Sequence, residues 1–316
     1  MSKWRSSASG KVIIGGTAFD TDAPIVNFLE GPKWDARIET CIATETDPNP
    51  FLPASDHQGC KIVDGTHAYA YQGDNGQRFT VRHQPRPALR NGPKEWLGGH
   101  KVPYDSAKQV IKQFMIHHDG CATADMCFSV IQNERGLSCH FLLDNDGTIF
   151  QTLDLALEGW HGSELNANSI GIELCNRGEI RTPADAEYYT KRGMKRDRKP
   201  CEVNGHKINS WDFTEEQKDS MRRLGRALLR LLPNLPAEYP QESPGQQLRK
   251  TMPRPDIMGF SGYIGHYHLT PTKWDPGPWD FKDFIQRIRG AFCFPMFPRG
   301  KPDDKQVQPV VPTQTS

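Results

Sequence analysis

The chain has 316 residues, and its 39 lysines and arginines nearly balance its 38 aspartates and glutamates, for a formal net charge of +1. This balance excludes a whole-molecule field that would attract nucleic acid, so we predict no nucleic-acid partner. No apolar run is long enough to span a bilayer, and the N-terminal residues lack the apolar core of a secretory signal. We therefore expect synthesis in the cytoplasm, without a signal peptide or an integral membrane segment.

The eight cysteines stand at irregular spacings without a CxxC pair, which argues against a cysteine-cluster zinc ribbon or a thioredoxin-like site. We interpret most of them as small buried residues in a reducing compartment. Cys121 and Cys127 are close enough in sequence to pair if the protein works outside the cytosol. His57 and Cys60 form a weak candidate pair of metal ligands.

Composition divides the chain into three parts. Residues 1–95 are rich in Gly, Pro, Asp and Asn with short β-like pieces such as KVIIGG and RFTVRH, which predicts a loop-rich, mostly β N-terminal extension. Residues 96–290 are predicted to form the main domain. Residues 291–316 are rich in Pro, Gln and charge with little to bury, which predicts a flexible tail.

The main domain begins with AKQVIKQFMIHH, a helical or strand-like apolar run that ends in His117 and His118 and is followed by an Asp-Gly turn signal. Neighbouring residues on a strand point to opposite faces, so a regular strand directs only one of these two histidines toward a given site. From the residues alone, either histidine is a candidate.

Two β features follow. SCHFLLDNDGTIFQTL joins two apolar runs around 145–147, whose Asn-Asp-Gly composition is typical of a hairpin turn. In SIGIELCN, Ile170, Ile172 and Leu174 alternate with Gly171, Glu173 and Cys175. The alternation predicts a strand that directs Glu173 away from its own apolar row.

Residues 214–217 have the spacing of a capping box, and the apolar residues after them recur at helical intervals until Pro233, which predicts a helix covering one face of the sheet. An irregular Pro-rich connection is expected up to Gly265. The next stretch, GHYHLTPTKWDPGP (265–278), is so rich in Pro and Gly that we expect a loop, neither helix nor central strand. A short helix is predicted in 279–290.

This loop carries candidate metal ligands. Zinc binds neutral imidazole and carboxylate in a tetrahedral site, and a catalytic zinc keeps one position for water. His117 or His118, together with His266 and Asp275, would supply three such ligands.

Two further residues fit a hydrolytic role. Zinc lowers the pKa of a bound water to about 7, and a nearby carboxylate can then complete its deprotonation. Glu173 is the natural base, because it is the carboxylate on an otherwise apolar strand. Lys273, two residues before Asp275, could place its ammonium beside the oxyanion that forms on attack.

The order of the motifs IHH, HFLLDNDGTIFQ, GWHG, NSIGIEL, the TEEQ helix and GHxxxxPxKxDPGPxxF resembles the zinc-dependent N-acetylmuramoyl-L-alanine amidases of the type-2 amidase family. That family also includes phage lysozyme-type amidases and animal peptidoglycan-recognition proteins. The resemblance covers roughly residues 95–290. It implies an α/β fold with a mixed central sheet flanked by helices, and one zinc ion per chain in a cleft on one face.

Carried over residue by residue, the resemblance implies His117, His266 and Asp275 as zinc ligands and Glu173 and Lys273 as catalytic residues. It implies hydrolysis of the amide between N-acetylmuramic acid and L-alanine of peptidoglycan, so the expected partner is peptidoglycan or a muropeptide. The remaining family-like positions predict substrate-binding residues, namely His140, Trp160 and His161.

Two rival functions remain: a recognition module that binds muropeptides without cutting them, and a cytosolic muropeptide-recycling amidase. The segments beyond the family favour cell-wall lysis by a phage endolysin or an injected effector acting at the wall or in the periplasm. Residues 1–95 or the tail would then dock onto a phage particle or an injection apparatus; alternatively, residues 1–95 would bind substrate. The basic insertion TKRGMKRDRKP (190–200) is either a solvated loop or a contact for carboxylates of the stem peptide.

Overall fold

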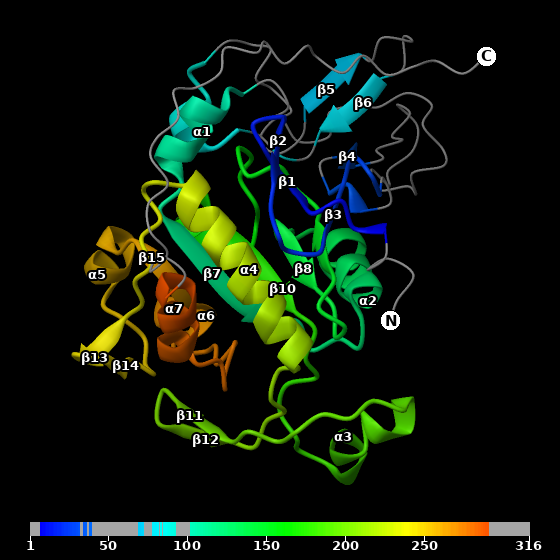
Figure 1. Cartoon of the computed structure of the whole chain (residues 1–316), viewed down its shortest axis with the longest axis vertical. Helices are drawn as coiled ribbons and strands as arrows, with labels where there is room; N and C mark the ends of the chain where they lie inside the picture. Colours follow the sequence, from blue (N-terminus) through cyan, green and yellow to red (C-terminus); the bar gives the residue numbers. More distant parts are fainter. Residues whose placement is uncertain are drawn as a thin grey trace, which may run out of the picture.

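The computed structural model describes residues 7–31, 34–36, 38–39, 69–72, 78–81, 83, 85–92 and 102–290; the predicted tail and the pair His57 and Cys60 lie outside them. A six-stranded sheet at the centre has the order β15–β7–β10–β8–β9–β3 (Figure 1). Its strands are β3 (Ile25–Asn27), β7 (Gln113–His118), β8 (Phe141–Leu143), β9 (Ile149–Gln151), β10 (Ser169–Leu174) and β15 (Gly262–Gly265). Neighbours run parallel except β8 and β9, which form the predicted antiparallel hairpin. The predicted mixed sheet is confirmed.

Helices and small hairpins surround this sheet. The helices are α1 (Tyr104–Val110), α2 (Ala124–Phe128), α3 (Pro183–Ala186), α4 (Glu215–Leu231), α5 (Arg254–Gly259), α6 (His266–Leu269) and α7 (Phe281–Arg289). The other strands are β1 (Lys11–Ile14), β2 (Thr17–Asp20), β4 (Ile38–Glu39), β5 (Tyr69–Gln72), β6 (Arg78–Val81), β11 (Cys201–Val203), β12 (His206–Ile208), β13 (Gln241–Ser243) and β14 (Gln246–Gln247). Across the described residues, every helix is too short or too polar to cross a membrane.

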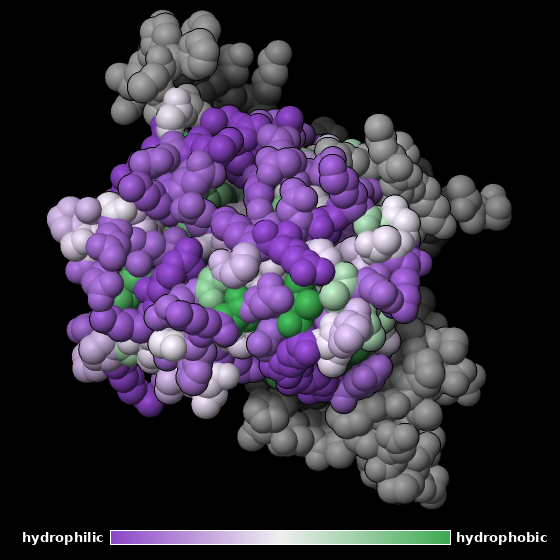
Figure 2. All heavy atoms as spheres, turned by 90° about the horizontal axis from the view of Figure 1, so that it is seen from below, coloured by the Kyte–Doolittle hydropathy of each residue, from purple (hydrophilic) through white to green (hydrophobic). Residues whose placement is uncertain are grey.

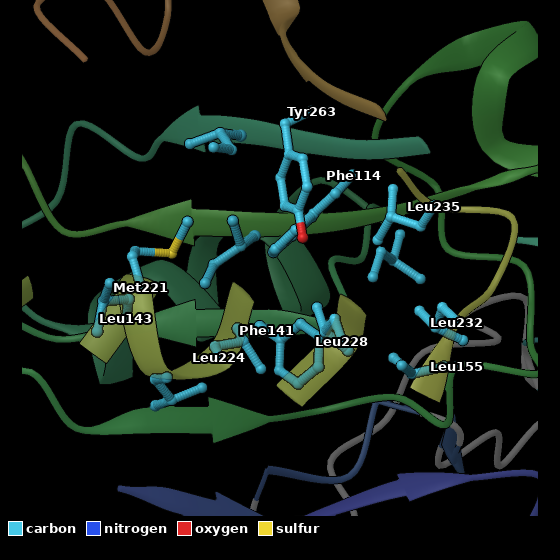
Figure 3. Packing of buried hydrophobic residues seen from close by; sticks show 14 of the residues in the cluster. Phe114, Phe141, Leu143, Leu155, Met221, Leu224, Leu228, Leu232, Leu235 and Tyr263 are labelled. Carbon is cyan, nitrogen blue, oxygen red and sulfur yellow. The ribbon is translucent and has the colours of Figure 1, made fainter. Parts of the chain in front are cut away.

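The main core lies between the central sheet and helices α4 and α7. Alternate strand residues such as Phe114, Phe141 and Tyr263 project toward Leu224 and Leu228 of α4 (Figure 3). We call this side of the sheet the apolar face. The opposite side, which carries His117 and Glu173, is called the site face.

Helix α4 forms where the capping box predicts it. Thr214 Oγ1 accepts a hydrogen bond from Gln217 N, and Gln217 Oε1 accepts one from Thr214 N, so two backbone donors at the helix start are satisfied. Met221, Leu224 and Leu228 are completely buried and share one side of the helix. The helix ends at Leu231, before Pro233.

The N-terminal segment is joined to the central sheet. β3 is the edge strand beside β9, and Gln151 exchanges hydrogen bonds of 2.8 Å with both Ile13 N and Ile13 O. The carboxylate of Asp154 accepts from Gly15 N and Gly16 N, each at 2.8 Å, so it fastens the turn between β1 and β2. The division at residue 95 stays a prediction about function, because structurally the sheet extends across it.

Two expectations for the C-terminal part were wrong. The connection before Gly265 is not irregular throughout, since 262–265 form β15 on the edge beside β7. The following stretch is not entirely loop, because 266–269 form one helical turn, α6. Four residues free of Gly and Pro suffice for a single turn, and the loop begins only after it.

Candidate active site

Three polar side chains from separate elements meet at the end of β7. His117 is the penultimate residue of that strand, His266 is the first residue of α6, and Asp275 lies in the loop that follows. His117 Nδ1 lies 3.1 Å from His266 Nδ1 and 3.0 Å from Asp275 Oδ2, and His266 Nδ1 lies 3.1 Å from the same oxygen. Three atoms that could bind a metal ion, two imidazole nitrogens and one carboxylate oxygen, therefore converge on one point.

The spacing suits a small tetrahedral metal ion. Ligand bonds of about 2.0–2.1 Å at the tetrahedral angle separate the ligand atoms by roughly 3.3 Å, slightly more than the distances found here. Two imidazole nitrogens and one carboxylate oxygen are a donor set that zinc accepts. The residues present therefore fit a zinc ion with one position left for another ligand.

The charge states of His117 and Asp275 agree with this use. Burial lowers the pKa of His117 to about 4, so its imidazole is neutral and retains a lone pair at neutral pH. Burial alone would raise the pKa of Asp275, but the neighbouring imidazoles of His266 and His117 lower it well below its ordinary value. Neutral imidazole and ionised carboxylate are the forms that bind metal.

Glu173 lies beside these three residues on the site face. In the parallel pairing of β10 with β7, Glu173 is level with His117. Its Oε2 is buried and has no hydrogen-bond partner among the described residues. Burial, reinforced by the charges of Asp119 and Asp275, raises the pKa of Glu173 well above its ordinary value. A desolvated carboxylate of this kind is a strong proton acceptor when ionised.

The four residues open into a pocket of about 130 Å³. Lys273, an exposed residue of the loop before Asp275, also lines it, as do Trp160 and the aliphatic side chain of Ile131. Figure 2 views the molecule from below, where hydrophilic residues surround a small central group of hydrophobic ones. The structure thus brings all five predicted zinc-ligand and catalytic residues together, while their roles remain predictions.

His118 is separated from the converging donor atoms. Its ring centroid lies 4.3 Å from that of Trp274, and neither ring nitrogen has a hydrogen-bond partner among the described residues. Of the two histidines that the sequence left as candidates, His117 is the one grouped with His266 and Asp275. Strand alternation explains this separation.

The prediction that His140 contacts substrate was wrong. The side chain has no exposed surface. Gly171 N donates to its Nδ1 at 3.1 Å, and its Nε2 lies 3.1 Å from both Leu157 O and Arg86 Nη2. Burial and the nearby charge of Arg86 lower the pKa of His140 well below its ordinary value. His140 therefore supports the surrounding backbone.

Trp160 and His161 do line the pocket. Trp160 N donates to Ser138 Oγ at 2.9 Å, and its ring contacts that of His83 from the N-terminal segment, with the centroids 4.7 Å apart. His161 points its Nδ1 toward His117 Nε2 at 3.3 Å. Substrate contact by Trp160 stays a prediction. The imidazole of His161 already contacts a protein group, the imidazole of His117.

Sequence reasoning missed Arg86, a completely buried residue of the N-terminal segment. Its guanidinium donates to Leu155 O at 2.8 Å and to Ser169 O at 2.9 Å, and its Nη1 also reaches the carbonyls of Asn166 and Ala167. It thereby fastens both ends of the segment that carries Trp160 and His161. No motif in the surrounding RHQPRPALR signals this burial.

Asp119 was interpreted only as a turn residue, yet it lines the pocket. Its Oδ1 accepts hydrogen bonds from Cys121 N and Asn176 N, at 2.9 and 3.0 Å. Burial raises the pKa of Asp119 to about 7. Its position directly after His117 and His118 in the sequence could have indicated that Asp119 lies near the site.

Several basic residues in and around the insertion are already engaged. Arg196 donates to Cys175 O, Tyr189 Oη and Gln217 Oε1, at 3.0, 2.8 and 2.8 Å. The guanidinium of Arg192 lies 3.8 Å from the centroid of the Tyr188 ring. Within the described part of the chain, no residue of 190–200 lines the pocket. These contacts favour a structural role for the insertion over contact with a stem peptide in the pocket.

The fold places a cleft whose residues fit a metal ion on one face of the sheet, and comparison with known proteins identifies the family. The family model described as N-acetylmuramoyl-L-alanine amidase matches residues 107–278, more than half of the chain. The chain belongs to this amidase family, which confirms the resemblance seen in the sequence and gives its enzyme class.

Similar solved structures include two amidases and a third protein that was solved with a muramyl peptide. The endolysin amidase LysCS from Clostridium intestinale is 15% identical over 58% of this chain and 86% of that one, with a TM-score of 0.35. AmiD from E. coli, in complex with a muramyl-peptide substrate, is 18% identical over 68% and 65%, with a TM-score of 0.37. AmpDh3 from Pseudomonas aeruginosa, with anhydromuramic pentapeptide, is 15% identical over 57% and 60%, with a TM-score of 0.36. No curated protein matches the chain. Because these identities and TM-scores are low, the assignment rests on the family model.

Proposed function

We propose that the protein is a zinc-dependent amidase that hydrolyses the bond between N-acetylmuramic acid and L-alanine in peptidoglycan. The observation that carries this proposal is the convergence of His117, His266 and Asp275 beside Glu173 in one pocket. The three converging groups hold the ion, and zinc, when bound, supplies a Lewis acid that polarises a carbonyl and acidifies water.

Glu173 is the proposed general base. It accepts a proton from the water whose oxygen attacks the carbonyl carbon of the lactyl group. When the carbon–nitrogen bond breaks, the same carboxyl returns this proton to the nitrogen of L-alanine. The products are a lactyl carboxylate and a free amine. The raised pKa of Glu173 makes its ionised carboxylate a stronger proton acceptor in the first of these steps.

Lys273 is the proposed partner of the developing oxyanion. It lines the pocket two residues before Asp275, so its ammonium can approach the carbonyl oxygen without joining the buried cluster. Because Lys273 is exposed, its side chain is free to move toward the substrate.

Metal content and amine release test this function together. The intact protein is incubated with purified peptidoglycan, zinc per chain is measured, and new L-alanine amino termini are quantified. We expect one zinc per chain, loss of zinc in Asp275→Ala, and retained zinc without turnover in Glu173→Ala. A protein that binds peptidoglycan without zinc and without releasing amines would instead be the recognition module.

We further propose that the enzyme acts on the bacterial cell wall after phage release or injection, with a phage particle or injection apparatus as a docking partner. Residues 1–95 include β3 and Arg86, so their removal would disturb catalysis and docking together. The tail gives a cleaner test. A chain lacking 291–316 should cleave purified wall normally but lose association with the particle, and unchanged association would exclude docking through the tail.

A further inference from the structure

His161 has a place in the site that differs from a substrate contact. Its Nδ1 lies 3.3 Å from His117 Nε2, and the two rings meet edge to face with centroids 5.4 Å apart. His117 uses its other nitrogen, Nδ1, to face His266 and Asp275. The two ring nitrogens of His117 thus contact different partners.

The surroundings of His161 are shaped to hold its ring there. A Cβ on Gly171 of β10 would lie only 2.7 Å from three atoms of the His161 ring, so only glycine lets the ring rest on the strand. The backbone on either side is fixed by Asn166, whose Oδ1 accepts from His161 N at 3.1 Å and from Gly162 N at 2.6 Å. The ring therefore has little freedom to turn toward a substrate.

We propose that His161 is a positioning residue for the metal ligand His117, an inference that rests on the zinc site of the proposed function. When Nδ1 of His117 binds the ion, its Nε2 carries the proton and donates it in a hydrogen bond to His161 Nδ1. This bond fixes both the tautomer and the rotation of the His117 ring. Metal-binding histidines usually have a carboxylate, a carbonyl or water in this place, and loss of such a partner costs about 10–100-fold in metal affinity or activity.

A second set of potential ligands must be distinguished, since His117 and His161 also lie near Cys139. A metal in that set would need the lone pair of His117 Nε2, whereas the first set needs the lone pair of Nδ1. A neutral imidazole has only one lone pair, so the two arrangements exclude each other. Cys139 belongs to an apolar cluster and does not line the pocket, which favours the set containing Asp275.

The test is the zinc dissociation constant of the full-length protein, measured by competition with a chelator. His161→Phe keeps a ring over Gly171 but removes the acceptor, and we expect zinc affinity to fall about 10–100-fold. His161→Asn retains an acceptor near the position of Nδ1 and should recover most of the affinity. Cys139→Ala should bind zinc like the unaltered protein. Thermal unfolding without metal identifies any variant that fails to fold.

A separate variant checks the geometry without changing His161. Gly171→Ala should push the ring away from His117 and weaken zinc binding in the same direction as His161→Phe. Equal zinc affinity of the unaltered protein and His161→Phe, with a raised KM, would overturn the inference in favour of substrate contact. Loss of zinc in Cys139→Ala would overturn it in favour of the other ligand set. Absence of zinc binding by the unaltered protein would overturn the proposed function itself.

Discussion

The two faces of the central sheet are made from alternate residues of the same strands, yet the site face buries ionisable groups as well as hydrocarbon. On β10, Ile170 and Ile172 enter the apolar core, while Gly171 and Glu173 between them belong to the site face. On the apolar face, burial removes hydrocarbon from water and stabilises the fold. On the site face, burial desolvates ionisable groups and shifts their pKa values. The cost of this desolvation lowers the stability of the fold, while the shifted pKa values suit the groups to proton transfer and metal binding. Stability and function should therefore respond to different residues of one strand.

The largest effect is expected on the site face. Glu173→Gln should lower kcat by about 10²–10⁴-fold, because the proton acceptor is lost while the shape is retained. Zinc affinity and the temperature of unfolding should not fall, since the change removes a buried carboxylate that lacks a partner at Oε2. Amine release from peptidoglycan, zinc content and thermal unfolding measure the three quantities. Glu202→Gln, on an exposed strand, is the matched control. Normal turnover of Glu173→Gln would contradict its assigned role.

The apolar face should show the opposite pattern. Leu224→Ala removes a completely buried side chain between α4 and the sheet, and it should lower the free energy of unfolding by about 2–5 kcal/mol. The zinc dissociation constant should stay the same, because the site lies on the other face. Denaturant unfolding and chelator competition provide the measurements, with exposed Arg230→Ala as the control on the same helix. Equal losses of stability and zinc affinity would show that the faces are coupled.

Acid should destabilise the protein through a buried histidine next to the site. Burial lowers the pKa of His268 to about 4 from an ordinary 6.5. Between these values the unfolded chain takes up a proton that the folded chain does not, so stability is present above pH 6.5 and is lost as pH falls toward 4. The loss from this group is at most about 3 kcal/mol.

Denaturant unfolding of the metal-free protein across this pH range measures the loss. His268→Gln should flatten the slope, whereas Leu224→Ala should lower stability at every pH and keep the slope. An unchanged slope in His268→Gln would assign the acid sensitivity to other groups.

The smallest effect concerns the start of α4. Thr214→Ala removes the side-chain acceptor for Gln217 N and should cost about 1 kcal/mol of unfolding free energy. Thr214→Ser keeps the hydroxyl and should remain within a few tenths of a kcal/mol of the unaltered protein. The same denaturant titration compares the two. Equal stability of all three proteins would mean that packing alone holds the helix.

Local patterns predicted the elements whose cause is local. The Asn-Asp-Gly turn predicted the hairpin, the capping box predicted α4, and the alternation around Glu173 predicted that its side chain lies on the face opposite the apolar row. The motif order also predicted which five residues would converge in the pocket. Each of these signals is contained in a few neighbouring residues.

Features that depend on distant partners could not be predicted in this way. β15 is a four-residue strand with a glycine at each end, and only its pairing with β7 makes it a strand. The burial of His140 depends on the backbone of Gly171, and the role of Arg86 depends on carbonyls more than about sixty residues away. None of these distant contacts leaves a local signal in the sequence.

The edge position of β3 has a consequence for how the molecule is made. Its residue Ile25 pairs with Ile149, so the strand leaves the ribosome more than about a hundred residues before its partner exists. At synthesis rates of about 5–20 residues per second, the apolar side chains of β3 stay unpaired with β9 for several seconds. The hairpin of β8 and β9 closes locally and needs no such delay. We therefore expect the first strand of the sheet to be synthesised to be among the last to join it, and nascent chains to need protection from aggregation during that interval.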